Sequence, residues 1–226
     1  MTMIADNLQR VHSRISDACK AIGRELQTVT LLAVSKTFEA DAIRQAYAAG
    51  QIAFGENYIQ EAVDKMALLS DLPLQWHCIG PIQSNKTRLV AEHFDWAHSV
   101  ERLKTAQRLS DQRPAGMAPL QVCIQVNIDG GANKAGVEPE ATFALAQQIQ
   151  ALPNLQLRGL MTIPEPAADF AAACAVHAKA RALWEALNAK GLGLDTLSMG
   201  MTADLEAAVH CGSTMVRVGS AIFGKR

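Results

Sequence analysis

The chain has 226 residues, of which 49% are apolar and 19% charged, and its 21 Lys and Arg residues nearly balance 22 Asp and Glu residues. A chain of this length buries about 70% of its surface on folding, so one sizeable core is expected without disulfides or a structural metal. No basic or acidic block would steer the protein toward nucleic acid or a membrane. We therefore expect neither as a partner.

The cysteine pattern and the N-terminal segment indicate where the protein works. The five cysteines are far apart and form no Cys-x-x-Cys pair, which disfavours a disulfide framework and a zinc site and favours a reducing compartment. Residues 1–25 mix charges with apolar residues at helical spacing, so they lack the apolar segment of a signal peptide. No run approaches the ~18 apolar residues of a membrane span. We expect a cytoplasmic protein with an N-terminal helix.

After that helix, β-rich runs alternate with longer segments of helical period. The runs lie at 30–36, 51–55, 74–80, 95–100, 121–127, 155–163, 195–200 and 213–219. This alternation indicates a parallel sheet, because a helix supplies the crossover between parallel neighbours. Eight units predict one α/β domain over residues 1–226, a (β/α)8 TIM-type barrel with an extra N-terminal helix. An open doubly wound sheet is the alternative, but its Gly-rich turn after the first strand is missing.

Lys36 is the first candidate functional residue, because it ends the first predicted strand and barrel active sites lie at the carboxyl ends of strands. Period-two alternation places it on the face of Leu32 and Val34. If that face is the barrel interior, desolvation lowers the pKa of the amine and favours Schiff-base formation with a carbonyl. The alternative is a lysine that leaves the sheet and reaches water.

The seventh and eighth units predict an anion site. The candidates are Ser198, Gly200, Thr202, Gly219 and Ser220. Small residues at helix starts leave backbone N–H groups open to an anion, and Thr202 is a candidate N-cap. Loops after strands seven and eight frequently bind phosphate in this fold. The alternative is that Ser198 and Ser220 only cap helices.

Arg217 is the third candidate, in an apolar strand and on the predicted face of Met215 and Gly219. Because arginine keeps its charge, a buried Arg217 needs an acceptor, and a structural ion pair or a ligand heteroatom would serve. Asn57 offers a neutral donor and acceptor at the same mouth, whereas His77 lacks metal-ligand spacing and is interpreted as a packing histidine. The set suggests pyridoxal phosphate, although a phosphosugar aldolase would also use the lysine and the phosphate site.

Several long motifs carry a family resemblance from about residue 30 to the last residue. They read LLAVSKTF, AFGENYIQEAVDK, WHCIGPIQSNK, FDWAHSVE, IQVNIDGGANKAGV, LRGLMTIP and LSMGMTADLEAAVHCGSTMVRVGSAIFG. The chain closely resembles the pyridoxal phosphate homeostasis protein family, the YggS type. The resemblance implies a barrel similar to the N-terminal domain of alanine racemase, with no established reaction and a role in keeping pyridoxal 5′-phosphate (PLP) bound and supplied.

The resemblance also implies roles for individual residues. PLP would be held as an aldimine on Lys36, its phosphate by the 198–202 loop and the 219–220 turn, and its pyridine nitrogen by Arg217. Asn57 and Met161 would line the pocket. The chain departs from the family pattern at 36–39, which reads Lys-Thr-Phe-Glu in place of Lys-Thr-Lys-Pro and so removes a second lysine, and more mildly at 134–136 and 202–204. Lys134 is another lysine that could take the aldehyde.

Two functional classes are compared, a cofactor carrier and a PLP-dependent racemase-like enzyme. A two-base racemase needs a second acid or base opposite the lysine, and the only tyrosines are Tyr47 and Tyr58, in a helix and beyond the second strand. A cationic Arg217 at the pyridine nitrogen would also make the ring a poor electron sink. We therefore expect a monomeric, non-catalytic carrier that delivers PLP to PLP-dependent apoenzymes.

Overall fold

The computed structural model describes residues 2–131 and 135–224. Eight strands form its centre: β1 (Thr30–Val34), β2 (Ala53–Glu56), β3 (Gln75–Cys78), β4 (Trp96–Val100), β5 (Leu120–Gln125), β6 (Leu155–Met161), β7 (Thr196–Ser198) and β8 (Met215–Val218). The α-helices are α1 (Met3–Ala21), α2 (Ala40–Ala48), α3 (Ile59–Leu68), α4 (Thr87–His93), α5 (Leu103–Gln112), α6 (Thr142–Gln150), α7 (Phe170–Ala189), α8 (Leu205–His210) and α9 (Ser220–Phe223). Two short 3-10 helices are η1 (Leu26–Thr28) and η2 (Pro139–Ala141).

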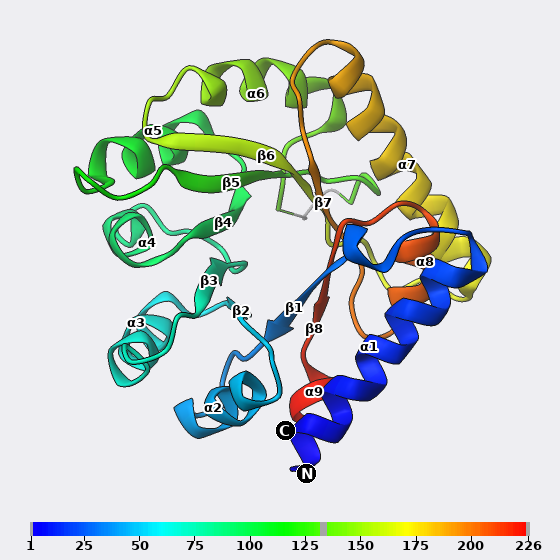
Figure 1. Cartoon of the computed structure of the whole chain (residues 1–226). Coiled ribbons are helices and arrows are strands. Elements are labelled where there is room, and N and C mark those ends of the chain that lie inside the picture. The colour runs from blue at the N-terminus through cyan, green and yellow to red at the C-terminus, as the bar shows by residue number, and fades with distance from the viewer. Residues whose placement is uncertain (1, 132–134, 225–226) are drawn as a thin grey trace.

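The strands form a closed parallel barrel in the order β1 to β8. Closure comes from the pairing of β1 with β8, in which Leu32 lies opposite Arg217 and Ala33 opposite Val218. Helices surround the strands, as Figure 1 shows, so each strand has one face toward the barrel interior and one toward a helix. The predicted (β/α)8 barrel is confirmed.

The N-terminal helix α1 is also confirmed, and it packs along α8 and α9 on one flank of the barrel (Figure 1). Thr2 caps it by accepting a hydrogen bond from the Ala5 amide, and its buried stripe of Ile4, Leu8, Val11 and Ile15 follows the helical period. The Asn7 side chain donates a 2.8 Å hydrogen bond to the Ile222 carbonyl. The extra helix thus joins the two ends of the described chain.

Two layers of apolar side chains follow from the alternation along each strand. Leu31 and Ala33 of β1 pack outward into the large core shared with the helices. Leu32 and Val34 point the other way, into an interior cluster with Ala53, Ile79 and Met215. The predicted facing of the first strand is therefore confirmed, and the interior is a filled core.

Several predicted boundaries are wrong. β1 ends at Val34, so Lys36 lies in the following turn and not on the strand. Strands six and eight also end before the predicted limits, at Met161 and Val218. Helix α8 begins at Leu205 with Asp204 at its N-cap position, so Thr202 is not the cap. None of the helices in the described residues is long and apolar enough to cross a bilayer.

Candidate functional site

A pocket of about 680 Å³ opens at the carboxyl ends of β1, β2 and β8. Six of the predicted residues line it together: Lys36, Asn57, Thr202, Arg217, Gly219 and Ser220. Its apolar walls come from Val34, Phe38, Ile79, Ile163 and Met201. Residues that lie more than 180 positions apart in the chain are thus gathered by the β1–β8 closure. The volume is in the range of small-molecule sites.

A second cavity of about 690 Å³ lies beside this pocket and shares Asn57, Ile79 and Ile163 with it. Its polar lining includes Glu101 and Lys104. Neither Lys36 nor Arg217 lines it. The pocket that contains these two residues is therefore the candidate site.

Lys36 lies in the turn between β1 and α2 and is half-buried. The Ser35 amide still donates to the Gly55 carbonyl at 3.0 Å, so the pairing with β2 extends to the residue before the lysine. Beyond the turn, the Phe38 ring packs on the Phe223 ring with centroids 5.1 Å apart. This contact joins the Lys36 turn to α9 and encloses one side of the pocket.

Arg217 lies on the predicted face of β8 with Met215, which is in the interior cluster, and is 4% exposed. Its guanidinium donates to the Ser198 carbonyl at 2.8 Å, to the Ser198 hydroxyl at 2.7 Å and to the Thr162 carbonyl at 2.8 Å. These acceptors are neutral, so the described contacts do not form the structural ion pair that the sequence left open. Burial lowers the pKa of Arg217 to about 10, so it stays charged at neutral pH. It has more N–H groups than these bonds use.

A directed chain of hydrogen bonds runs from Arg217 through the barrel interior. Ser198 Oγ lies 3.0 Å from His98 Nδ1, His98 Nε2 lies 2.9 Å from His77 Nδ1, and His77 Nε2 lies 3.0 Å from Gln75 Oε1. Arginine only donates and the amide oxygen only accepts, so the donor and the acceptor of each hydrogen bond between them are fixed. Both imidazoles then carry their proton on Nε2. Burial lowers the pKa of His77 to about 3 and that of His98 well below its ordinary value, so both are neutral.

Another part of the pocket rim is formed by small residues and hydroxyls after β7 and β8. Ser220 Oγ and Thr202 Oγ1 lie 3.3 Å apart. A side chain at Gly219 would bring its Cβ within 3.1 Å of the Val34 carbonyl oxygen, so glycine lets β8 approach β1 closely. The rim therefore presents two hydroxyls beside a closely packed backbone.

Asn57 enters the pocket because the loop after β3 leaves room for it. A Cβ at Gly80 would lie 2.6 Å from Asn57 Cα, so only glycine permits this approach of the two loops. Within the described residues, the buried Asn57 Oδ1 has no hydrogen-bond partner. A buried acceptor of this kind needs a hydrogen-bond donor, such as one on a bound ligand.

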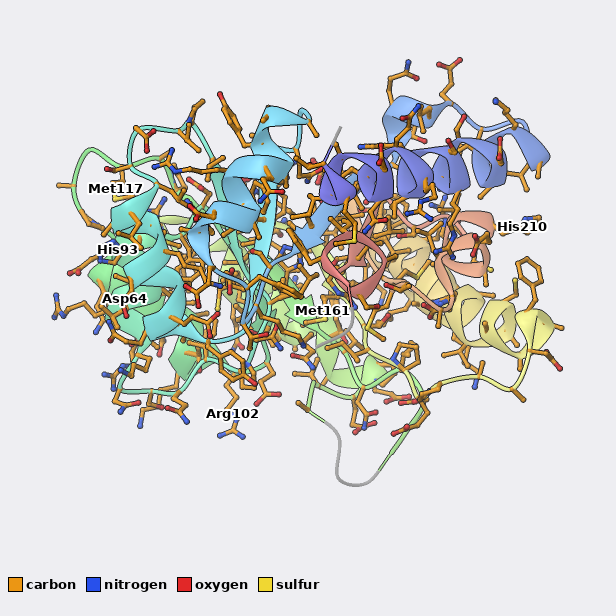
Figure 2. The ribbon with its side chains drawn as sticks, turned by 90° about the horizontal axis from the view of Figure 1, so that it is seen from below. Asp64, His93, Arg102, Met117, Met161 and His210 are labelled. Carbon is orange, nitrogen blue, oxygen red and sulfur yellow. The ribbon has the colours of Figure 1, made fainter. Side chains whose placement is uncertain are left out.

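Three predicted residues lie outside the pocket lining. The Ser198 side chain is fully buried and bonded to Arg217 and His98. Gly200 has a φ of 91° and sits where a Cβ would overlap Ala208, so it allows β7 to turn under α8. Met161 packs with Trp96 and Cys123 inside the barrel, and Figure 2 shows it among the side chains near the middle of the molecule. Lys134 lies outside the described residues.

Sequence analysis missed the groups that support the site. Glu56 and Lys65 form a buried ion pair at 2.9 Å next to the Lys36 turn, and His98 connects Ser198 to His77. Glu56 ends an apolar strand, which is the same signal that singled out Lys36. His98 and the contact of Lys65 with the Ser35 carbonyl have no such signal, because these partners are distant in the sequence.

The fold and the site place the chain in a class of PLP-related barrels. The family model for the alanine racemase N-terminal domain matches residues 7–226. The chain is 61% identical to the pyridoxal phosphate homeostasis protein of Pseudomonas aeruginosa, over 100% of this chain and 97% of that protein. It is 49% identical to the protein of that name from Escherichia coli K12, over 100% and 98% of the two chains. The chain therefore belongs to the pyridoxal phosphate homeostasis protein family.

Solved structures agree with this assignment. PipY of Synechococcus elongatus with PLP bound superposes with a TM-score of 0.85 at 40% identity, covering 98% of this chain and 100% of that one. Alanine racemase of Clostridium difficile superposes with a TM-score of 0.76 at 15% identity, covering 98% of this chain and 57% of that one. The second likeness concerns the fold alone.

Proposed function

We propose that the chain, as one barrel domain over residues 1–226, binds PLP in this pocket and takes part in keeping the cofactor available. The observation that carries the proposal is the pocket itself, which joins the Lys36 amine, the Arg217 guanidinium and the hydroxyls of Thr202 and Ser220. The PLP-bound PipY relative supports the same cofactor. When bound, PLP supplies a reactive aldehyde on an electron-withdrawing ring.

The residues of the pocket fit such a group. A volume of about 680 Å³ accommodates a small aromatic phosphate ester, and Val34, Ile79 and Ile163 supply apolar contact for a ring. The partnerless Asn57 Oδ1 would accept a hydrogen bond from a ligand hydroxyl or protonated group. Cationic, neutral polar and apolar groups thus line the same pocket, as recognition of such a ligand requires.

Lys36 is proposed to hold the cofactor covalently. Its amine would bond to the aldehyde carbon of the cofactor, with loss of the aldehyde oxygen as water. Thr202, Gly219 and Ser220 would receive the phosphate through hydroxyl and backbone N–H donors. Gly200 and Ser198 would contribute indirectly, the first by shaping the loop and the second by holding Arg217. Met161 would contribute through packing in the interior.

Arg217 supports a carrier more than an enzyme. Its charge at the pyridine nitrogen would disfavour protonation of that nitrogen, because two positive charges in one pocket repel. The ring would then stabilise a carbanion poorly, which limits side reactions of a stored aldehyde. We propose that the chain has no efficient amino-acid turnover, that it is a cytoplasmic monomer, and that PLP-dependent apoenzymes receive the cofactor.

Borohydride trapping tests the binding mode. Protein loaded with PLP is reduced, digested and mapped by mass spectrometry, and the pyridoxyl group is expected on Lys36, with visible absorbance lost in Lys36→Ala. Lys20→Ala is the matched control, because that side chain is 74% exposed on α1. A label predominantly on another lysine, with absorbance kept in Lys36→Ala, would show that the assignment is wrong.

The racemase-like alternative has its own test. Loaded protein is incubated with alanine and other amino acids, and enantiomers and keto acids are measured by chiral chromatography. Turnover near the typical enzyme value of about 10 per second, abolished by Lys36→Ala, would replace the carrier with an enzyme. The expected result is no racemisation or keto-acid release at such rates.

A further inference from the structure

The turn that carries Lys36 has an unusual backbone. Thr37 has a φ of 64°, the only positive φ outside glycine among the described residues. The left-handed region is disfavoured for a residue with a Cβ and especially for a β-branched one. Such a conformation persists where neighbouring groups hold it. The side chains that hold Thr37 in this conformation come from helix α3 and strand β2.

Two side chains of α3 bond to the peptide groups on either side of Lys36. Lys65 Nζ donates to the Ser35 carbonyl, which precedes Lys36, at 3.0 Å. Glu61 Oε1 accepts a hydrogen bond from the Thr37 amide, which follows Lys36, at 2.6 Å. The backbone is thus fixed immediately before and immediately after the residue proposed to bind the cofactor.

These two side chains are themselves held by a buried cluster. Lys65 Nζ donates to Glu56 Oε1 at 2.9 Å and to Glu61 Oε1 at 2.6 Å, and Ser35 Oγ donates to Glu56 Oε1 at 2.6 Å. With the bond to the Ser35 carbonyl, all three N–H groups of the Lys65 ammonium are used. The Glu56 side chain is 0% exposed and that of Lys65 8%, whereas Glu61 is 32% exposed. The cluster therefore has a rigid inner part and a more accessible outer carboxylate.

The arrangement does more than neutralise a buried charge. Buried ion pairs contribute little net stability compared with apolar side chains of the same size, so stability alone gives weak reason for one at this place. Here Glu61 and Lys65 bond to each other, and each also forms a hydrogen bond to the backbone of the Lys36 turn. Charged donors and acceptors make the stronger hydrogen bonds, and both contacts to the turn are of that type.

We propose that Glu61 and Lys65 are positioning residues that hold the Lys36 turn in the conformation in which its amine bonds to the cofactor aldehyde. The inference rests on the proposed function of Lys36 and deepens it. It separates two parts of binding. Contacts to ring and phosphate come from the rest of the pocket, whereas formation of the C=N bond depends on the α3 cluster.

Two ligands distinguish these parts. PLP has an aldehyde, and pyridoxine 5′-phosphate has an alcohol in its place, so only PLP bonds covalently to an amine. Glu61→Ala removes the acceptor of the Thr37 amide and is expected to weaken PLP affinity about tenfold, the effect of one charge-assisted hydrogen bond. The affinity for pyridoxine 5′-phosphate should stay within about twofold, because that ligand depends on the unchanged walls of the pocket.

Glu61→Gln and Asp64→Ala complete the series. Glutamine keeps an amide oxygen that can accept from Thr37, so Glu61→Gln is expected to restore most of the PLP affinity. Asp64 is an exposed carboxylate on the same helix, toward the outside of the molecule in Figure 2, and Asp64→Ala should behave as wild type. Hydrogen exchange gives a readout without ligand, since the Thr37 amide should exchange faster in Glu61→Ala while the β1 amides keep their protection.

The outcomes separate the possible failures. Equal loss of affinity for both ligands in Glu61→Ala, or unchanged PLP affinity and unchanged Thr37 exchange, would overturn the positioning role. If wild-type protein bound neither ligand, the proposed function itself would be wrong, whatever the Thr37 exchange showed. Urea unfolding of each variant at the same pH verifies that the comparison concerns folded protein.

Discussion

The two sides of the pocket hold their key residues by different means. On the β1–β2 side, the charged cluster of Glu56, Glu61 and Lys65 acts on the backbone around Lys36. On the β7–β8 side, Arg217 is held at its own guanidinium by the neutral groups of Ser198 and Thr162. A nucleophile needs its nitrogen for chemistry and is best supported through its backbone, whereas an arginine that only donates can be fixed at its donors.

The ionic cluster should give the largest effect. Lys65→Met leaves Glu56 buried and without its cation, which costs about 3–5 kcal/mol of unfolding free energy. The measurement is urea unfolding at pH 7, with Lys20→Met as an exposed control. Adding Glu56→Gln to Lys65→Met should recover much of the loss, because the buried charge is then gone. A loss below about 1 kcal/mol in Lys65→Met would contradict the burial of an uncompensated carboxylate.

The histidine chain should respond to acid. The folded-state pKa values of His77 and His98 lie below the ordinary value of 6.5, so the unfolded state binds more protons as the pH falls below 6.5. Stability is then lost on acidification, by about 2 kcal/mol for each histidine between pH 7 and pH 5. Urea unfolding across that range measures the slope.

Two variants test whether the buried histidines cause this pH dependence of stability. His77→Gln combined with His98→Gln should flatten it, whatever its effect on stability at pH 7. His93→Gln should leave it unchanged, because His93 is exposed. Equal slopes in all three proteins would mean that the buried pair does not resist protonation.

Ser198 links Arg217 to the histidine chain. Ser198→Ala removes an acceptor of Arg217 and the donor to His98, which we expect to cost about 1–3 kcal/mol. The loss should be nearly independent of salt, unlike that of a pair of exposed charges. Ser70→Ala on an exposed loop is the control. Urea unfolding of both variants at low and high salt measures this loss. A loss of stability in Ser198→Ala that disappears at high salt would contradict the assignment of neutral acceptors to Arg217.

The partly exposed ion pair between α1 and α8 should give the smallest effect. Arg14 on α1 donates to Glu206 on α8 at 2.6 Å, and this hydrogen bond holds the pKa of Glu206 below its ordinary value of 4.5. Its stabilisation is present above pH 4.5 and lost as the pH falls further. Arg14→Gln should cost less than about 1 kcal/mol at pH 7, and the difference from wild type should narrow below pH 4.5. A constant difference in urea unfolding would contradict a charge effect.

The fold was predictable because its signal is local. Each strand of the barrel is a short apolar run and each crossover a helical segment, so the alternation predicts a parallel sheet and its eight units predict closure. The structure then shows that the faces of Leu32, Val34 and Arg217 point inward. Strand ends were less predictable. Residues such as Ser35 and Lys36 continue the local pattern, and the structure turns there because α3 side chains bond to the backbone.

The supporting groups were not predictable for a different reason. His77 and His98 are 21 residues apart, and their 2.9 Å contact depends on the register between β3 and β4. Lys65 reaches the Ser35 carbonyl from a separate helix, 30 residues along the chain. No local sequence pattern predicts contacts between residues that are so far apart in the chain. The pocket residues Lys36, Arg217 and Ser220 were found because a charge at the end of or within an apolar strand, or a hydroxyl at a helix start, is visible in the sequence.

The pairing of β1 with β8 also has a consequence for the order of events during synthesis. The lysine side of the pocket is made early, whereas Arg217, Gly219 and Ser220 are translated more than 180 residues after Lys36. Until they emerge, β1 has an unpaired edge that is prone to association with other chains. The ability to bind the cofactor should therefore arise in a single late step. A chain halted before residue 215 should expose β1 to chaperones and proteases. It should also show no partial affinity for the cofactor, because its pocket is incomplete.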